Sequence, residues 1–258
     1  MTHPYFDTAT SPRVLAHRGL VTAAGEDSGV WENSAAAFAA AQAAGAEYIE
    51  TDCRVTADGD VVLFHDDTLT RLTGDDRQVS AVTTKELRDL FADHGGLLSL
   101  ADALASFPGT RFNIDVKTDA AAAPLGPVLA AHTERVLVTS FSDRRRRTAV
   151  ASVLAAGARL RPATSGGSST IASLRALSSV RLSPARSLRD LDAVQIPEKQ
   201  SGLRVLTPAL IRAAHAHGVE VHVWTVNDPE DMVRLVAMGV DGIVSDRADV
   251  AVRTLSRG

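Results

Sequence analysis

The chain has little cysteine and no excess of positive charge, and each shortage excludes a class of protein. Cys53 is its only cysteine, so no internal disulfide can form. The 258 residues carry a net charge of -4 at pH 7, without the basic excess that is typical of nucleic-acid-binding domains. We therefore expect neither a disulfide scaffold nor a nucleic-acid partner.

Long apolar stretches are missing as well. No uninterrupted apolar run approaches the ~20 residues that a membrane-spanning helix needs. Residues 1–13 lack the basic segment and the apolar core of a signal peptide. These absences predict a cytoplasmic protein without stable membrane insertion, and the sequence leaves its oligomeric state open.

What the sequence does contain is a regular alternation of short apolar runs with helical segments. The length suits one large α/β barrel or two small domains. Eight predicted strands are each followed by a helix without a break in composition, which favours one (β/α)8 TIM barrel over residues 1–258. The predicted strands are 13–19, 47–55, 111–117, 135–141, 159–162, 192–196, 219–226 and 241–245.

Two features interrupt this alternation. An Asp-Gly turn at 58–59 joins the second predicted strand to the apolar run 61–65, and so short a connection pairs strands antiparallel. We therefore interpret 61–65 as a hairpin arm on strand two and not as a barrel strand. The polar segment 66–98 is predicted to be a small insertion folded over one face. Predicted loops occupy 20–31 and 165–169.

Two acidic residues lie inside the second predicted strand. Glu50 and Asp52 are two residues apart, so both side chains point to the same face of the strand. Two buried like charges are costly unless positive charge lies between them, and carboxylate oxygens are the ligands that a hard divalent cation prefers. A solvated edge strand with two surface acids is the alternative interpretation.

Further polar residues are predicted at the same end of the barrel, where the carboxyl ends of the strands form the active-site face. They are His17 and Arg18 after strand one, His65 on the hairpin arm, Asp115 and Lys117 on strand three, and Trp224 late on strand seven. Three carboxylates can hold Ca²⁺ or Mg²⁺ and leave positions open for an anion, while arginine and lysine attract phosphate. Two histidines can serve as base and acid on opposite sides of a phosphorus centre. This layout is the one expected for cleaving a phosphodiester.

Six short motifs follow one another along the chain. They are His17-Arg18-Gly19, Glu32-Asn33-Ser34, Glu50-Thr51-Asp52, His65-Asp66, the run 113–117 and the run 223–227. In this order and at these barrel positions the set resembles the glycerophosphodiester phosphodiesterase family, over nearly the whole chain. The resemblance implies Glu50, Asp52 and Asp115 as ligands of one divalent cation, His17 and His65 as the acid/base pair, and Arg18 and Lys117 as phosphate contacts.

Three further residues are expected to support the site. Glu32 and Asn33 are predicted to hold His17 or Arg18 in place, with capping of the following helix as the alternative. Trp224 is predicted to stack on a glycerol or a headgroup, with filling of the barrel mouth as the alternative. The other histidines are assigned no role.

Two departures from the family pattern concern the cation and the substrate. The family usually has glutamate where this chain has Asp115, which is one methylene shorter and bears on how the ion is held. The sequence Trp31-Glu32-Asn33-Ser34 replaces the more usual Pro-Glu-Asn-Thr, after a long loop that bears on substrate identity.

The resemblance implies an enzyme that splits a glycerophosphodiester into sn-glycerol 3-phosphate and an alcohol, with a small-molecule substrate as its partner. A lysophospholipase D-like activity on single-chain lipids is one alternative. A non-catalytic barrel that binds a phosphorylated ligand is the other, and the paired His17 and His65 argue against it because binding needs no acid and base.

Overall fold

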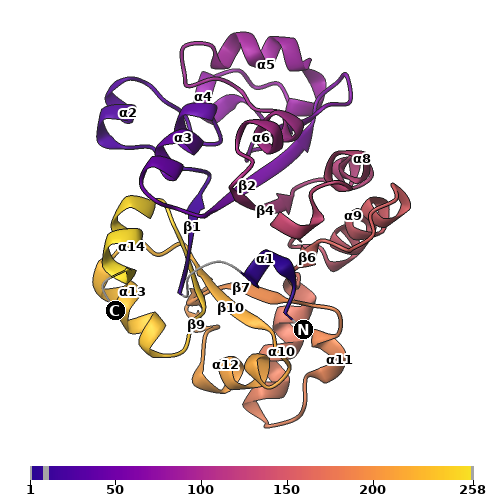
Figure 1. Ribbon diagram of the computed structural model, residues 1–258, viewed down its shortest axis with the longest axis vertical. Coiled ribbons are helices and arrows are strands. Elements are labelled where there is room, and N and C mark those ends of the chain that lie inside the picture. The colour runs from indigo at the N-terminus through magenta and orange to yellow at the C-terminus, as the bar shows by residue number, and fades with distance from the viewer. Residues whose placement is uncertain (1, 8–11, 257–258) are drawn as a thin grey trace.

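The computed structural model describes residues 2–7 and 12–256 of the chain. Met1, residues 8–11 and residues 257–258, which the predicted domain includes, lie outside the described residues. Within the described ranges, eight parallel strands form an inner ring with helices outside it (Figure 1). The strands are β1 (Arg13–His17), β2 (Tyr48–Val55), β4 (Arg111–Val116), β5 (Val136–Thr139), β6 (Ala163–Thr164), β7 (Ala193–Pro197), β10 (Glu220–Trp224) and β11 (Gly242–Ser245).

The strands close into a nearly complete barrel. Their order is β6-β5-β4-β2-β1-β11-β10-β7, and every neighbouring pair runs parallel. β6 and β7 stand at the two ends of this order, and a parallel bridge from Ser165 to Ala193 joins them. The predicted (β/α)8 TIM barrel is therefore confirmed.

Helices connect the strands and cover the outside of the barrel. Ser34, Thr207 and Asp228 each begin a helix, with a side-chain oxygen that accepts a backbone N–H of the first turn. Between the helices and the strands lie two large apolar cores. None of the described helices is both long and apolar enough to cross a membrane. The outer helices are α3 (Ala35–Ala43), α6 (Leu100–Ser106), α7 (Asp119–Ala122), α8 (Leu125–Leu129), α9 (Asp143–Ala155), α10 (Ser168–Ser179), α11 (Ala185–Leu188), α12 (Pro208–His215), α13 (Pro229–Ala237) and α14 (Ala248–Leu255).

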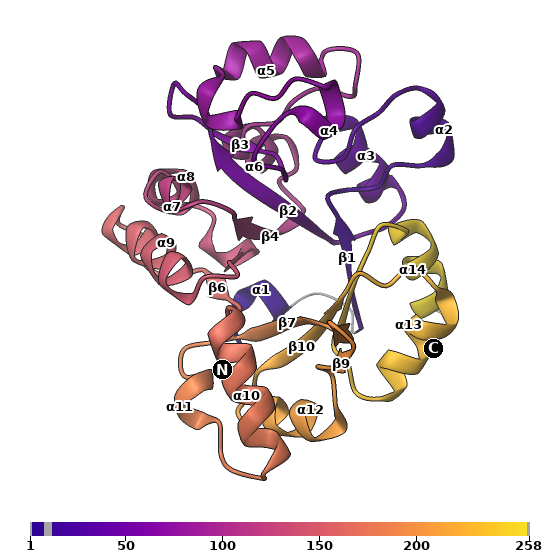
Figure 2. The same ribbon diagram turned by 180° about the vertical axis from the view of Figure 1, so that it is seen from behind.

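The segment after the second strand forms a small lobe of its own. β3 (Val61–Leu63) pairs antiparallel with β2, as the Asp-Gly turn predicts. The chain then forms α4 (Thr70–Thr73), a short 3₁₀ turn and α5 (Thr84–Phe91), which bury a separate apolar cluster that includes Phe64 and Leu87. Figure 2 shows this lobe at one edge of the molecule, with α5 outermost.

The amino-terminal end of the barrel, where the strands begin, is closed by the helix α1 (Pro4–Asp7). Its Tyr5 and Phe6 are buried beneath the strands, and the Tyr5 and Tyr48 rings meet edge to face at 5.1 Å. The Tyr48 hydroxyl donates to the Tyr5 carbonyl at 3.0 Å, and the Arg13 guanidinium donates to the Phe6 carbonyl at 3.2 Å. Because the amino-terminal end is filled, the polar side chains near the carboxyl ends of the strands are accessible from the carboxyl-terminal end of the barrel.

Three predicted boundaries are wrong. The fifth predicted strand, β6, begins at Ala163 and not within 159–162. Pro162 has no N–H to donate, and Asp192 fixes the start by accepting from Thr164 N at 2.8 Å. The predicted loop 165–169 already contains the start of α10, whose first N–H groups are satisfied by the Asp143 carboxylate. The predicted loop 20–31 contains a short helix, α2 (Ala23–Asp27).

The buried Tyr5 ring gives a test of the closed end. Tyr5→Ala should lower the free energy of unfolding by about 3–5 kcal/mol, the range for truncating a buried large aromatic side chain. Tyr5→Phe is the matched control, because the buried hydroxyl has no hydrogen-bond partner among the described residues and its removal should cost nothing. Urea denaturation followed by circular dichroism measures both, and equal stability of the two variants would contradict the closure by α1.

Candidate active site

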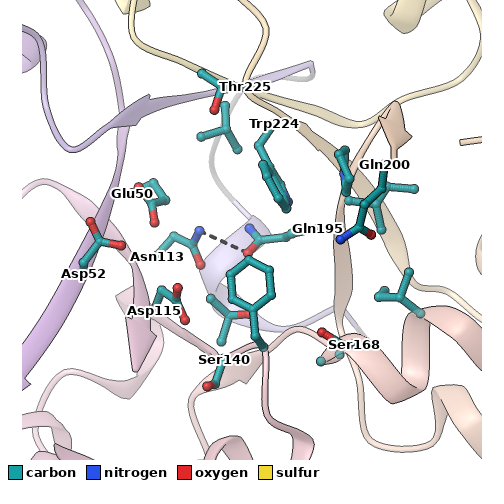
Figure 3. Close-up of a pocket in the computed structure, with 18 of the residues that line it drawn as sticks. Glu50, Asp52, Asn113, Asp115, Ser140, Ser168, Gln195, Gln200, Trp224 and Thr225 are labelled. Carbon is teal, nitrogen blue, oxygen red and sulfur yellow. Dashed lines mark hydrogen bonds between the residues drawn. The ribbon is translucent and has the colours of Figure 1, made fainter. Parts of the chain in front are cut away.

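The predicted site residues converge on one cavity of about 380 Å³ at the carboxyl ends of the strands. In Figure 3 the carboxylates of Glu50, Asp52 and Asp115 gather on one side of this cavity, and Trp224 lies on the other. His17, Arg18, His65 and Lys117 also line it. Glu32 and Asn33 lie behind this lining and contact it through hydrogen bonds.

The three carboxylates come together because of strand register. Asp52 of β2 is directly opposite Asp115 of β4, and Glu50 lies two residues earlier on the same inward face. One oxygen of Glu50 (Oε2) and one of Asp115 (Oδ1) are buried without a hydrogen-bond partner among the described residues. Burial, reinforced by the charge of Asp52, raises the pKa of Glu50 to about 8. Burial also raises the pKa of Asp115.

Asp52 is the carboxylate whose charge is neutralised by partners. Lys117 Nζ lies 2.8 Å from its Oδ1, while Arg18 Nε and Asn33 Nδ2 each lie 3.2 Å from its Oδ2. Burial disfavours the charged form, but the nearby cations outweigh it and lower the pKa of Asp52. The Lys117 ammonium also lies 2.7 Å from Asp115 Oδ2, so it bridges β2 and β4.

His17 is oriented by an aspartate from the other end of the chain. Its Nδ1 lies 2.6 Å from Asp246 Oδ1, and Asn227 in turn donates to Asp246 Oδ2 at 2.8 Å. The other ring nitrogen, Nε2, lies 3.8 Å from Glu50 Oε2. Burial disfavours the imidazolium, but the hydrogen bond to Asp246 and the charge of Glu50 outweigh it and raise the pKa of His17.

His65 has a matching arrangement. Its Nδ1 lies 2.6 Å from Asp66 Oδ1, which leaves Nε2 without that partner. Arg71 of α4 donates to the other oxygen of Asp66 and also pairs with Glu32. Since Glu32 accepts from Arg18 Nη1 at 2.9 Å, the small lobe is connected to both His65 and Arg18.

Asn33 joins the turn after β1 to β2. Its backbone N–H donates to the Arg18 carbonyl at 2.8 Å, and its side chain accepts from Thr51 Oγ1 at 2.7 Å. Arg18 and Asn33 both adopt positive φ, 56° and 58°. The N-cap of α3 is Ser34, so capping of that helix is not the role of Glu32 or Asn33.

With this geometry established, similarity to known proteins identifies the family. The model of the glycerophosphoryl diester phosphodiesterase family matches residues 17–250. The probable glycerophosphodiester phosphodiesterase 2 of Mycobacterium tuberculosis is 38% identical over 243 residues, which cover 92% of this chain and 88% of that protein. The chain belongs to the glycerophosphodiester phosphodiesterase family. The resemblance predicted from the six motifs is therefore confirmed, and with it the phosphodiesterase class of enzyme.

Solved structures agree on the fold of this phosphodiesterase. A putative glycerophosphodiester phosphodiesterase from Galdieria sulphuraria superposes with a TM-score of 0.75 at 22% identity and covers 97% of this chain and 100% of its own. A phosphodiesterase from Oleispira antarctica, solved with the product sn-glycerol-3-phosphate, gives a TM-score of 0.72 at 22% identity and covers 95% and 97%. At these identities the likeness shows the fold alone.

Several residues at or next to this cavity had no role assigned from the sequence. Asp66 directly follows His65, and Asp246 directly follows the last strand, so the strand-end rule could have found both. Arg71 had no local signal, because its contact with Glu32 joins segments 39 positions apart. Phe141 follows β5, is 56% exposed, and has its ring centroid 5.9 Å from that of Trp224.

Asp246 provides a test of how His17 is oriented. Asp246→Asn should lower the pKa of His17, because it removes a charged partner that favours the imidazolium while burial, which disfavours it, remains. NMR titration of the histidine ring protons measures the shift. Asp249→Asn, on nearby α14, is the control and should leave His17 unchanged, whereas an unaltered His17 pKa in Asp246→Asn would contradict the assignment.

Proposed function

We propose that this enzyme hydrolyses glycerophosphodiesters to sn-glycerol 3-phosphate and an alcohol, with His17 and His65 as the acid/base pair. The observation that carries the proposal is that each imidazole is bound through Nδ1 to its own aspartate, Asp246 or Asp66. Each Nε2 is thereby left for the substrate in the shared cavity, which is the arrangement that proton transfer requires.

The reaction needs two proton transfers, one to the first histidine and one from the second. One neutral imidazole accepts a proton from the nucleophile as its oxygen bonds to phosphorus. The nucleophile is water or the neighbouring hydroxyl of the glycerol, and in the second case water then opens the cyclic phosphate to sn-glycerol 3-phosphate. The other imidazole, protonated, donates its proton to the alcohol oxygen as the phosphorus–oxygen bond breaks. The aspartate behind each ring stabilises the imidazolium form and fixes which nitrogen faces the substrate.

Two positively charged side chains line the cavity and are proposed to bind the phosphate. Arg18 and Lys117 both line the cavity and are held by Asp52, so their charge is positioned before the substrate arrives. A guanidinium, which can donate two hydrogen bonds to one phosphate, and an ammonium would stabilise the negative charge that develops on the phosphate oxygens. Glu32 and Asn33 keep Arg18 in place through its guanidinium and its carbonyl.

One divalent cation, Ca²⁺ or Mg²⁺, completes the proposal. The donor set fits it, since Glu50 and Asp115 each have a buried carboxylate oxygen that lacks a partner in the described chain. No preformed group of three ligating side chains is found among the described residues, so Glu50, Asp52 and Asp115 would hold the ion together with the substrate. When bound, it would neutralise phosphate charge as the transition state forms.

The decisive experiment is a turnover panel with chelator controls. Glycerophosphocholine, glycerophosphoethanolamine and glycerophosphoinositol should release sn-glycerol 3-phosphate, and chelation should abolish turnover. His17→Ala and His65→Ala should each lower kcat by about 10²–10⁴-fold, the scale for general acid–base groups. His217→Ala, an exposed histidine, is the control. Preferred cleavage of lysophosphatidylcholine would replace the proposal by a lysophospholipase D activity, and full turnover with chelator would remove the cation.

Asp115 tests the cation site where this chain departs from its family. Asp115→Asn should weaken cation binding and kcat/KM, because it removes a charge and keeps the shape. Asp115→Glu should also weaken both, since the side chain is buried and already lies 2.7 Å from Lys117, so one more methylene crowds it. Titration of the cation against melting temperature measures affinity without turnover. An asparagine variant as metal-avid as the parent would exclude Asp115 as a ligand.

A further inference from the structure

A chain of polar side chains crosses the interior of the barrel from its closed end to the floor of the cavity. Its links are Arg13 to Glu220 at 2.7 Å, Glu220 to His222 at 3.0 Å, His222 to Gln195 at 3.2 Å, and Gln195 to Asn113 at 3.2 Å. These residues lie on β1, β10, β7 and β4, and all point inward. Figure 3 shows its last link, between Asn113 and Gln195, in the middle of the cavity.

From Asn113 through Gln195 and His222 to Glu220 the hydrogen bonds all run in one direction, and Arg13 donates to Glu220 from the other side. Burial disfavours ionised Glu220, but its bonds with Arg13 and His222 outweigh burial and lower its pKa to about 2, so Glu220 only accepts. His222 therefore donates from Nε2, and in the neutral imidazole its Nδ1 accepts from Gln195 Nε2. Gln195 Oε1 then accepts from Asn113 Nδ2.

The direction of the chain decides what Asn113 presents to the cavity. Since its Nδ2 is engaged by Gln195, its Oδ1 is the atom left over, and this oxygen is buried without a partner among the described residues. Asn113 lines the cavity, is 1% exposed, and pairs in register with Glu50. A buried acceptor without a donor costs about 1–3 kcal/mol, so the site is built for a ligand that donates a hydrogen bond there.

We propose that Asn113 determines specificity by accepting a hydrogen bond from a hydroxyl of the glycerol moiety, with Gln195 and His222 as positioning residues. The inference rests on the proposed function. The phosphate of a diester is ionised and offers only acceptors, so it is no partner for Asn113 Oδ1. The groups that donate are the hydroxyls of the glycerol and the hydroxyls, or in glycerophosphoethanolamine the ammonium, of the departing alcohol.

The glycerol hydroxyls fit this position better than those of the departing alcohol. Asn113 lies on the barrel floor next to Glu50, and the glycerol, which all substrates share, is the part that a fixed polar position of this kind would recognise. Toward the mouth, the cavity is lined by exposed Phe141 together with Ile171 and Val205, an apolar surface that suits alcohols of varied structure.

Deoxy substrates test the assignment. In one set, propane-1,2-diol or propane-1,3-diol replaces the glycerol while the departing alcohol stays the same. In the other, the glycerol stays and the departing alcohol has or lacks hydroxyls. The parent should lose about 10- to 100-fold in kcat/KM on at least one of the deoxyglycerol substrates, from one buried hydrogen bond. Asn113→Ala should lose the same factor on the glycerol substrate, so that its discrimination against that deoxyglycerol substrate falls toward one.

Two other variants separate positioning from packing. Gln195→Met keeps the size of the side chain but removes both of its hydrogen bonds. The ratio of kcat/KM on the glycerol substrate to kcat/KM on the deoxyglycerol substrate should then fall in part, while KM on the deoxyglycerol substrate is unchanged. Ile171→Val alters the apolar lining and should keep the parent's discrimination ratio. Gln195→Met also carries the test if Asn113→Ala does not fold.

The two proposals fail in different ways. If the parent turns over glycerophosphodiesters but Asn113→Ala keeps the parent's discrimination ratio, this inference alone is overturned. It is also overturned if the parent discriminates only by the hydroxyls of the departing alcohol. Absence of glycerophosphodiester turnover by the parent overturns the proposed function. A ¹⁵N NMR spectrum of labelled protein gives a readout without turnover: His222 should be the neutral Nε2–H tautomer, and an Nδ1–H tautomer would reverse the chain and overturn the assignment of Asn113.

Discussion

The structure of the site depends on the repulsion among three buried carboxylates. Glu50, Asp52 and Asp115 face the same interior from two adjacent strands, where negative charges in a poorly hydrated space cannot all remain unpaired. Asp52 is neutralised by Lys117 and Arg18, whereas Glu50 and Asp115 each retain an unpartnered oxygen. Lys117 and Arg18 are held at this point of the barrel for that reason, and the two unpartnered oxygens are where further positive charge would be stabilised.

The neutralising charges are themselves fixed by residues from distant parts of the chain. Glu32 holds the Arg18 guanidinium, and the same glutamate contacts Arg71 from the lobe after β3. Arg71 also contacts Asp66, the partner of His65. The small lobe is thus part of the electrostatics of the cavity and not only a cover over one end of β2. Because these ion pairs share members, the loss of one charge would alter the interactions of several others.

The amino-terminal half of the barrel interior contains apolar packing with a chain of hydrogen-bonded side chains running through it. The amino-terminal end is filled by Tyr5, Phe6 and Tyr48. This packing continues toward the carboxyl ends of the strands with Leu15 and Leu137. Through it passes the chain of hydrogen bonds from Glu220 to Asn113. A polar chain in such surroundings is stable only when its donors and acceptors are matched, and the one mismatch among its links is the Asn113 oxygen that faces the cavity.

The sequence by itself determined the features that depend on local periodicity. Alternation with a period of two placed Glu50 with Asp52 and Asp115 with Lys117 on common faces, and the strand–helix rhythm predicted the barrel and its active end. Only the tertiary structure decided which residues meet across the barrel: Asp246 orients His17 from 229 positions away, and Asn113 meets Gln195 across 82 positions. The start of β6 was likewise set in part by the Asp192 carboxylate, 28 positions from the residue whose N–H it accepts. These contacts follow from the register of the strands as the barrel closes, and register is a property of paired strands that no single segment encodes.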